Sequence, residues 1–158
     1  QEAIGEDKFL NQIYSAEEMS GLTKNFSRRY AKFRNSNELE VELASSFMSM
    51  LDVGVDIVLG TDAGAVPNHP FGYTGHRELE IYVRLGMSPM QAIVAAPSNA
   101  AKHLGLPDLA LMKAAYSADF IILDENPLEE IRNTRTIDSV YLSGNRIDRT
   151  ALQRGWNP

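Results

Sequence analysis

A short apolar run that ends in a glycine-flanked acid constrains this chain more than any other feature. The run covers residues 55–59, and Gly60, Asp62 and Gly64 follow it closely. It is too short and too rich in β-branched residues for a helix, so it predicts a buried strand. Gly54 in front of the run is suited to ending a preceding helix. Helix, tight turn, buried strand and glycine-flanked acid together form the unit of a parallel α/β sheet or barrel.

Asp62 is the first candidate functional residue. In parallel α/β folds the loops that leave the carboxyl ends of the strands carry the chemistry, and Asp62 stands at such a position. Gly60 and Gly64 allow the backbone to turn closely around it. The alternative is that Asp62 only caps the next segment, as aspartate often does. The run by itself leaves both interpretations open.

Composition excludes several classes of protein. The chain has 158 residues, which is enough for one domain with a core, and a net charge of −6. Its acids are scattered, so no nucleic-acid partner is expected. No apolar run reaches membrane-spanning length and no signal-peptide pattern is present, so no membrane partner is expected either. The absence of cysteine excludes thiolate zinc sites and fits a cytoplasmic location.

Periodicity and capping residues predict helices on both sides of the run and a β element after them. Ser15 and Glu18 form a capping-box pattern for a short helix that Gly21 can end. Further helices are expected over 22–33, 39–53, 77–85, 89–96 and 98–104. A strand is expected over 120–123, one helical turn over 128–131, and a hairpin of 137–142 with 146–148. The basic residues between 24 and 34 are interpreted as a solvated helix face rather than a phosphate site.

Several segments, in order, resemble the amidohydrolase superfamily, and its imidazolonepropionase-like and prolidase-like branches in particular. Residues 57–64 look like the last barrel strand of that family. Later segments resemble the family's chain beyond that strand, namely 75–80, 86–92, 98–101, 117–124, 126–128 and 131–133. The resemblance covers roughly residues 38–150 and implies an α/β fold. Residues 1–108 would be the C-terminal part of a (β/α)8 TIM barrel, and residues 109–158 the C-terminal strands of a small β-sandwich domain.

The resemblance implies a metal-dependent hydrolase of C–N bonds in amides or cyclic amides. In that family the aspartate of the last strand, here Asp62, binds a divalent metal, expected to be zinc, and accepts the proton of the attacking water. This chemistry suits a metal that activates water next to a carboxylate that moves the proton. His76 is expected to orient the loop or to contact the substrate, which would be a small amide or dipeptide-like molecule.

Much of the family's metal site is absent from the sequence. The His-x-His of strand one, the lysine or glutamate of strand four and the histidines of strands five and six have no counterpart. A whole barrel takes on the order of 250 residues, so the chain is interpreted as the C-terminal portion of such a protein. Locally, Pro97 replaces a usual threonine, and Ala115 replaces the glycine of a usual Pro-Gly-Lys turn. A self-contained site of Asp62, His69 and His76 is the weaker interpretation, because catalytic zinc needs three well-placed ligands. His103 is expected near a helix C-terminus.

Two alternatives belong to other functional classes. The chain could be a non-catalytic fragment that assembles through exposed barrel edges, either as a homo-oligomer or with a complementary N-terminal part. It could also be a flavodoxin-like domain that binds a phosphate at the glycine-flanked turn. This last alternative is the weakest, since no second strand-loop-helix unit with a phosphate cradle is evident.

Overall fold

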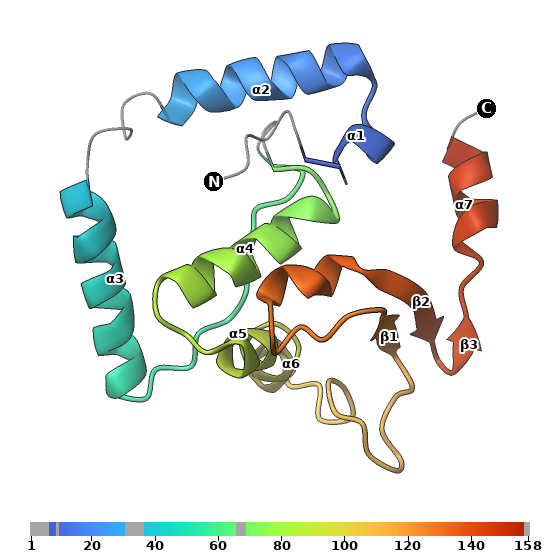
Figure 1. Cartoon of the computed structure of the whole chain (residues 1–158). Helices are drawn as coiled ribbons and strands as arrows, with labels where there is room; N and C mark the ends of the chain where they lie inside the picture. The colour runs from blue at the N-terminus through green and yellow to red at the C-terminus, as the bar shows by residue number, and fades with distance from the viewer. Residues whose placement is uncertain (1–6, 9, 31–36, 66–68, 157–158) are drawn as a thin grey trace.

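The computed structural model describes residues 7–8, 10–30, 37–65 and 69–156, and their arrangement is a set of helices around α4 with a small sheet beside them (Figure 1). The helices are α1 (Leu10–Ile13), α2 (Ala16–Tyr30), α3 (Asn37–Asp52), α4 (Tyr73–Arg84), α5 (Pro89–Ala95), α6 (Ser98–Leu104), the 3-10 helix η2 (Ile131–Arg135) and α7 (Arg149–Trp156). The strands are β1 (Phe120–Leu123), β2 (Ile137–Leu142) and β3 (Asn145–Arg146). None of the helices in these ranges is long and apolar enough to cross a membrane.

Capping residues begin α2 and α5 where the sequence predicts, whereas α4 begins at Tyr73 rather than near Arg77 and has no side-chain cap. The Ser15 backbone N–H donates to the Glu18 carboxylate at 2.8 Å, and the Glu18 N–H donates to Ser15 Oγ at 3.3 Å, which closes the predicted capping box at α2. Ser88 and Gln91 form the same motif at α5. The expected end at Gly21 is wrong, because α2 continues through it. One glycine weakens a helix by only about 1 kcal/mol, which the rest of a long helix can offset.

The strand predicted over 55–59 pairs with no other strand in the described residues. These residues run extended, but they form no β-ladder, and the sheet in the described residues contains only β1, β2 and β3. A strand requires a neighbour that completes its backbone hydrogen bonds, and no other parallel strand lies in the described part of the chain. Helix α3 therefore has no sheet to pack on within the described residues. On α3, Val41 and Leu43 are 68% and 54% exposed.

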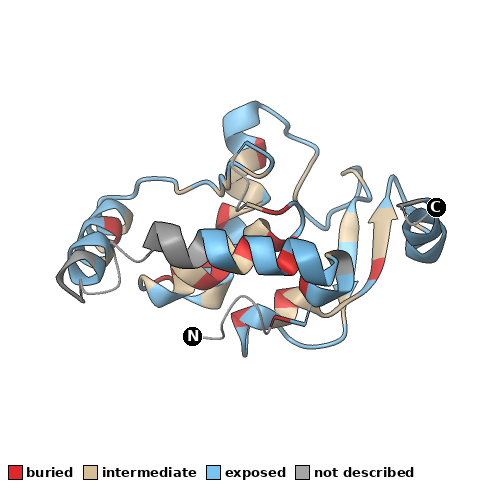
Figure 2. Ribbon diagram, turned by 90° about the horizontal axis from the view of Figure 1, so that it is seen from above, coloured by how far each residue is buried: buried red, intermediate tan, exposed pale blue. Residues whose placement is uncertain are grey.

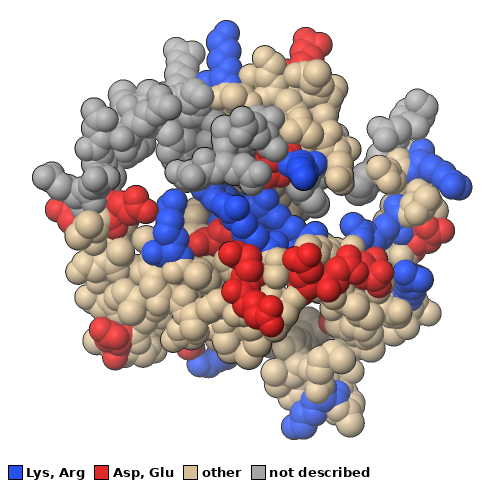
Figure 3. Space-filling model, in the orientation of Figure 1, with Lys and Arg blue, Asp and Glu red and all other residues tan. Residues whose placement is uncertain are grey.

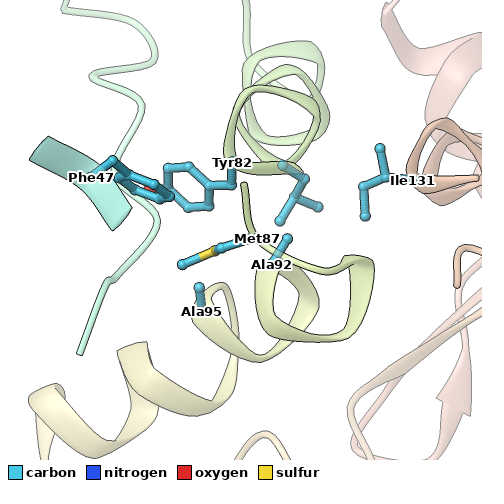
Figure 4. Packing of buried hydrophobic residues seen from close by; sticks show 7 residues of the cluster. Phe47, Tyr82, Met87, Ala92, Ala95 and Ile131 are labelled. Atoms are coloured by element: carbon cyan, nitrogen blue, oxygen red, sulfur yellow. The ribbon is translucent and has the colours of Figure 1, made fainter. Parts of the chain in front are cut away.

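The main core lies between α3, α4, α5 and η2. Phe47 and Tyr82 pack ring against ring, with centroids 5.5 Å apart, and Met87 fills the space below them (Figure 4). Ile131 of η2 closes the other side of α4. Buried side chains gather on the inward faces of these helices, while their outer faces are exposed (Figure 2). A second, smaller cluster joins α1 and α2 to Tyr73 at the start of α4.

The C-terminal β element forms as predicted. β1 and β2 pair antiparallel, with Phe120 opposite Tyr141 and their rings stacked 4.6 Å apart. Ser143 and Gly144 both have positive φ, at 49° and 78°, which is the geometry of a tight hairpin turn into β3. At the expected helical turn of 128–131, the Glu129 and Glu130 N–H groups donate to the Asn126 carbonyl, and the 3-10 helix η2 follows from Ile131. Helix α7 was not predicted from the sequence.

Candidate functional site

Asp62 lies at the exposed end of the extended segment that leaves α3. Its φ of +51° falls in the left-handed region, which is uncommon for any residue other than glycine and which aspartate tolerates better than most. Its backbone carbonyl accepts a hydrogen bond from the Ala65 N–H at 3.0 Å. The prediction of a turn around this acid is confirmed. The turn presents the carboxylate to solvent.

His69 stabilises the turn through hydrogen bonds of its side chain and of its backbone carbonyl. Its Nδ1 donates to the Thr61 carbonyl at 2.6 Å, and its own carbonyl accepts from the Gly64 N–H at 3.2 Å. The Thr61 hydroxyl in turn accepts from the Ala63 N–H at 3.2 Å. His69 is half-buried, and the contacts of its Nδ1 and its carbonyl hold the backbone of the turn.

Gly64 has a positive φ and lies close to the exposed ring of Phe71. Its φ is +81°, and a Cβ at this position would stand 2.2 Å from the Phe71 ring. Any larger residue would have to move that ring as well as adopt a strained backbone. The glycine on the downstream side of the acid thus allows the loop to fold against the turn.

Side chains of α4 and α6 contact the backbone of the extended segment before Asp62. The Glu78 carboxylate accepts from the Gly60 N–H at 3.1 Å, and the Tyr82 hydroxyl lies 3.1 Å from the Val58 carbonyl. Asn99 Nδ2 donates to the Ile57 carbonyl at 2.8 Å. These three contacts were not predicted from the sequence. The only available signal was that residues 78 and 82 stand four apart, on one face of a helix.

His76, the predicted substrate contact, is half-buried on α4 and faces η2. Its Nδ1 lies 3.0 Å from Thr134 Oγ1. The Thr134 hydroxyl donates to the Ile131 carbonyl at 2.9 Å, so its oxygen is the acceptor for His76. Burial lowers the pKa of His76, and the nearby Arg135 lowers it further, while Glu80 opposes them. The imidazole is accordingly held in its neutral form, with a proton on Nδ1.

A cluster of charged side chains lies behind His76, and no pattern in the sequence predicted it. Arg135 of η2 pairs with the buried Glu80 of α4 and, at 2.7 Å, with the buried Asp7. Arg77 binds the other Glu80 oxygen at 2.9 Å. Figure 3 shows a group of basic side chains beside a row of acidic ones near the middle of the face in view. Since each buried carboxylate has a guanidinium partner, we interpret the cluster as a structural link between α4, η2 and the N-terminal stretch.

The described residues do not supply a metal site. They contain no group of three or more histidine, aspartate or glutamate side chains close enough to hold an ion. His69 and His76 are each engaged through Nδ1 with Thr61 and Thr134, and no ligand set forms around Asp62. His103 lies instead at the end of α6, 4.0 Å from an Asp56 oxygen that also binds Lys102. The residues that the structure describes therefore do not by themselves fit a catalytic zinc centre.

Known proteins resemble this chain over most of its length. The amidohydrolase family matches residues 15–147. Ochratoxinase from Aspergillus niger is 35% identical over 124 residues, which are 77% of this chain and 23% of that enzyme. Imidazolonepropionase from Deinococcus radiodurans is 30% identical over 102 residues, which are 62% of this chain and 25% of that enzyme. The chain thus spans about a quarter of the length of these curated relatives.

Solved structures of known proteins are also similar to this chain. Molinate hydrolase superposes with a TM-score of 0.65 at 28% identity, over 84% of this chain and 31% of that one. A Xaa-Pro dipeptidase with methionine bound in its active site superposes with a TM-score of 0.59 at 30% identity, over 66% of this chain and 25% of that one. The resemblance inferred from the motifs around Asp62 is thereby confirmed. The chain belongs to the amidohydrolase family.

Proposed function

We propose that this chain is the C-terminal part of a metal-dependent hydrolase that cleaves amide or cyclic amide C–N bonds. Residues 55–59 would be the last strand of a (β/α)8 barrel whose other strands lie outside the chain. Asp62 would act as a metal ligand and accept a proton from the attacking water. The remaining ligands of the divalent metal, expected to be zinc, would come from those other strands, because the described residues do not provide them.

One observation carries this proposal. Within a chain that belongs to the amidohydrolase family, the segment that resembles the last barrel strand ends in an exposed acid on a braced turn. A carboxylate in that exposed position is open to a ligand. The bound metal would supply a Lewis acid for the water and for the scissile carbonyl.

Small amides are the proposed substrates, and Asp62→Asn is the test. The relatives include an ochratoxinase, an imidazolonepropionase and a Xaa-Pro dipeptidase. We expect the longer parent protein to hydrolyse methionylproline or N-benzoylphenylalanine, and Asp62→Asn to lower kcat/KM by at least about 100-fold, the usual contribution of a positioned proton acceptor. The substitution preserves shape and removes only the charge and the basicity.

Asp138→Asn is the matched control. Asp138 is exposed on β2, in the separate β element, and the same substitution there should leave kcat/KM unchanged. An active Asp62→Asn variant would remove Asp62 from the mechanism. Loss of activity in both variants would point to a general effect of lost charge instead.

Exposed apolar residues favour a second candidate, a non-catalytic fragment that assembles with itself or with a complementary chain. Val41 on α3 and Val53 just after that helix are 68% and 79% exposed, and Val55 is 46% exposed. This candidate predicts that the isolated chain sediments as concentration-dependent oligomers, because apolar surface of this kind is buried by association. A compact monomer at every concentration would contradict it.

A further inference from the structure

The side chain of Glu78 connects helix α4 to the segment that leads to Asp62. One of its carboxylate oxygens, Oε1, accepts two hydrogen bonds, from the Gly60 N–H at 3.1 Å and from the Tyr82 hydroxyl at 2.6 Å. Gly60 stands only two residues before Asp62. A single side-chain oxygen therefore joins the helix to the backbone immediately upstream of the acid.

Two further side chains, Tyr82 and Asn99, contact the backbone just before Gly60. The Tyr82 hydroxyl also lies 3.1 Å from the Val58 carbonyl, so its one hydrogen is shared between that carbonyl and Glu78. Asn99 donates to the Ile57 carbonyl. Tyr82 is 8% exposed, and burial followed by the hydrogen bond to Glu78 raises its pKa above the ordinary value of 10. The phenol accordingly remains a donor at neutral pH.

His69 holds the turn on the C-terminal side of Asp62. His69 holds the Thr61 carbonyl, and the Gly64 N–H bonds back to the His69 carbonyl. Asp62, with its φ of +51°, lies between the two anchored parts. A residue keeps such a backbone conformation only where its surroundings determine it. Removing the upstream anchor would release one end of the turn while the core around Tyr82 remained packed.

We infer that Glu78 is a positioning residue, which fixes the direction of the Asp62 carboxylate by holding the Gly60 N–H against α4. The role assigned to Asp62 rests on the proposed function, whereas the anchoring by Glu78 does not. The anchor requires an acceptor oxygen rather than a charge. Glu78→Gln, whose amide oxygen can accept the same two hydrogen bonds, should therefore preserve it, and Glu78→Ala should abolish it.

Amide hydrogen exchange measured by NMR on the 158-residue chain tests the anchor without any substrate. We expect Glu78→Ala to speed exchange at Gly60 by about tenfold, as loss of one net hydrogen bond allows, and Glu78→Gln to stay within about threefold of the unchanged chain. The Gln91 amide, which is held by the Ser88 capping box, should exchange equally in all three. Unchanged exchange at Gly60 in Glu78→Ala, or equal acceleration at Gln91, would overturn the inference.

Kinetics of the longer protein with methionylproline test the consequence for Asp62. Glu78→Ala should lower kcat by about tenfold or more with KM within about twofold, since misplacement of a reacting group affects the chemical step, and Glu78→Gln should restore kcat. Glu40→Ala, which removes an exposed glutamate paired with Arg84 at 3.2 Å, is the matched control and should change neither constant.

The outcomes separate the two claims. If Asp62→Asn abolishes activity but Glu78→Ala leaves kcat unchanged, the positioning role is wrong and the proposed function stands. If Asp62→Asn remains active, or if the longer protein hydrolyses neither amide, the proposed function is wrong and the exchange experiment alone decides whether Glu78 anchors the turn.

Discussion

Ala115 shows at the scale of one residue how a departure from a family pattern is accommodated. It occupies the place of a glycine in the turn before β1 and adopts φ of +72°. The Tyr116 N–H closes this turn on the Lys113 carbonyl at 3.1 Å. A Cβ in the left-handed region costs roughly 1–2 kcal/mol, whereas glycine adopts that region freely. The turn therefore retains a glycine-like conformation on an alanine, and this strain opposes folding.

Ala115→Gly should consequently stabilise the protein. We expect the free energy of unfolding to rise by about 1 kcal/mol, since relief of the strain exceeds the entropy that a glycine adds to the unfolded chain. Urea denaturation of the isolated chain measures the change. Ala114→Gly, next to it and outside the left-handed region, should leave stability unchanged or lower it by roughly 0.5 kcal/mol. A loss of stability in Ala115→Gly would contradict this account of the turn.

The turn at Asp62 could be predicted at this scale because a tight turn has a local signature. Gly60 and Gly64 indicated it, and Gly64 adopts a φ of +81° there, whereas Gly60 has no positive φ. The partners of the turn could not be predicted in the same way. Gly60 and Glu78 are 18 residues apart, and Glu80 and Arg135 are 55 apart, so only the packing of α4 brings them together.

Helix α4 is the element on which the site and the core both depend. One of its faces carries Tyr82 into the core and Glu78 to the extended segment, while His76 and Glu80 contact η2. Apart from α1, α7 and the start of α4, the helices and the hairpin were predictable because caps and turn residues act within a few positions of the sequence. The strand at 55–59 was not, because its apolar pattern favours an extended chain but only a neighbouring strand makes the ladder.

The buried position of His76 on α4 predicts a dependence of stability on pH. Its pKa in the folded chain lies below the ordinary 6.5, so the unfolded chain binds more protons as the pH falls through that value. Stability should therefore decrease from about pH 7.5 to about pH 5.5, and the decrease should be smaller in His76→Gln. Thermal unfolding followed across this range measures it. His103→Gln, at an exposed histidine of α6, should keep the full decrease, and an equal slope in His76→Gln would contradict the assignment.

On the scale of the whole molecule, an incomplete site and an uncovered apolar face occur together. The described residues hold one exposed acid on a braced turn without further metal ligands around it. Beside it, residues 55–59 have no strand neighbours within the described ranges, and the adjoining valines are exposed. The relatives are about four times as long as the matched region. Both features are accounted for if the rest of a barrel covers the face and adds the remaining ligands.

Titration of zinc into the longer protein after removal of its metal tests this account most directly. If Asp62 is a ligand, Asp62→Asn should weaken zinc binding by at least about tenfold, because even an indirect contact to a metal contributes that much, while Asp138→Asn should bind as tightly as the unchanged protein. Equal zinc affinity in all three proteins would contradict the assignment of Asp62 to the metal site.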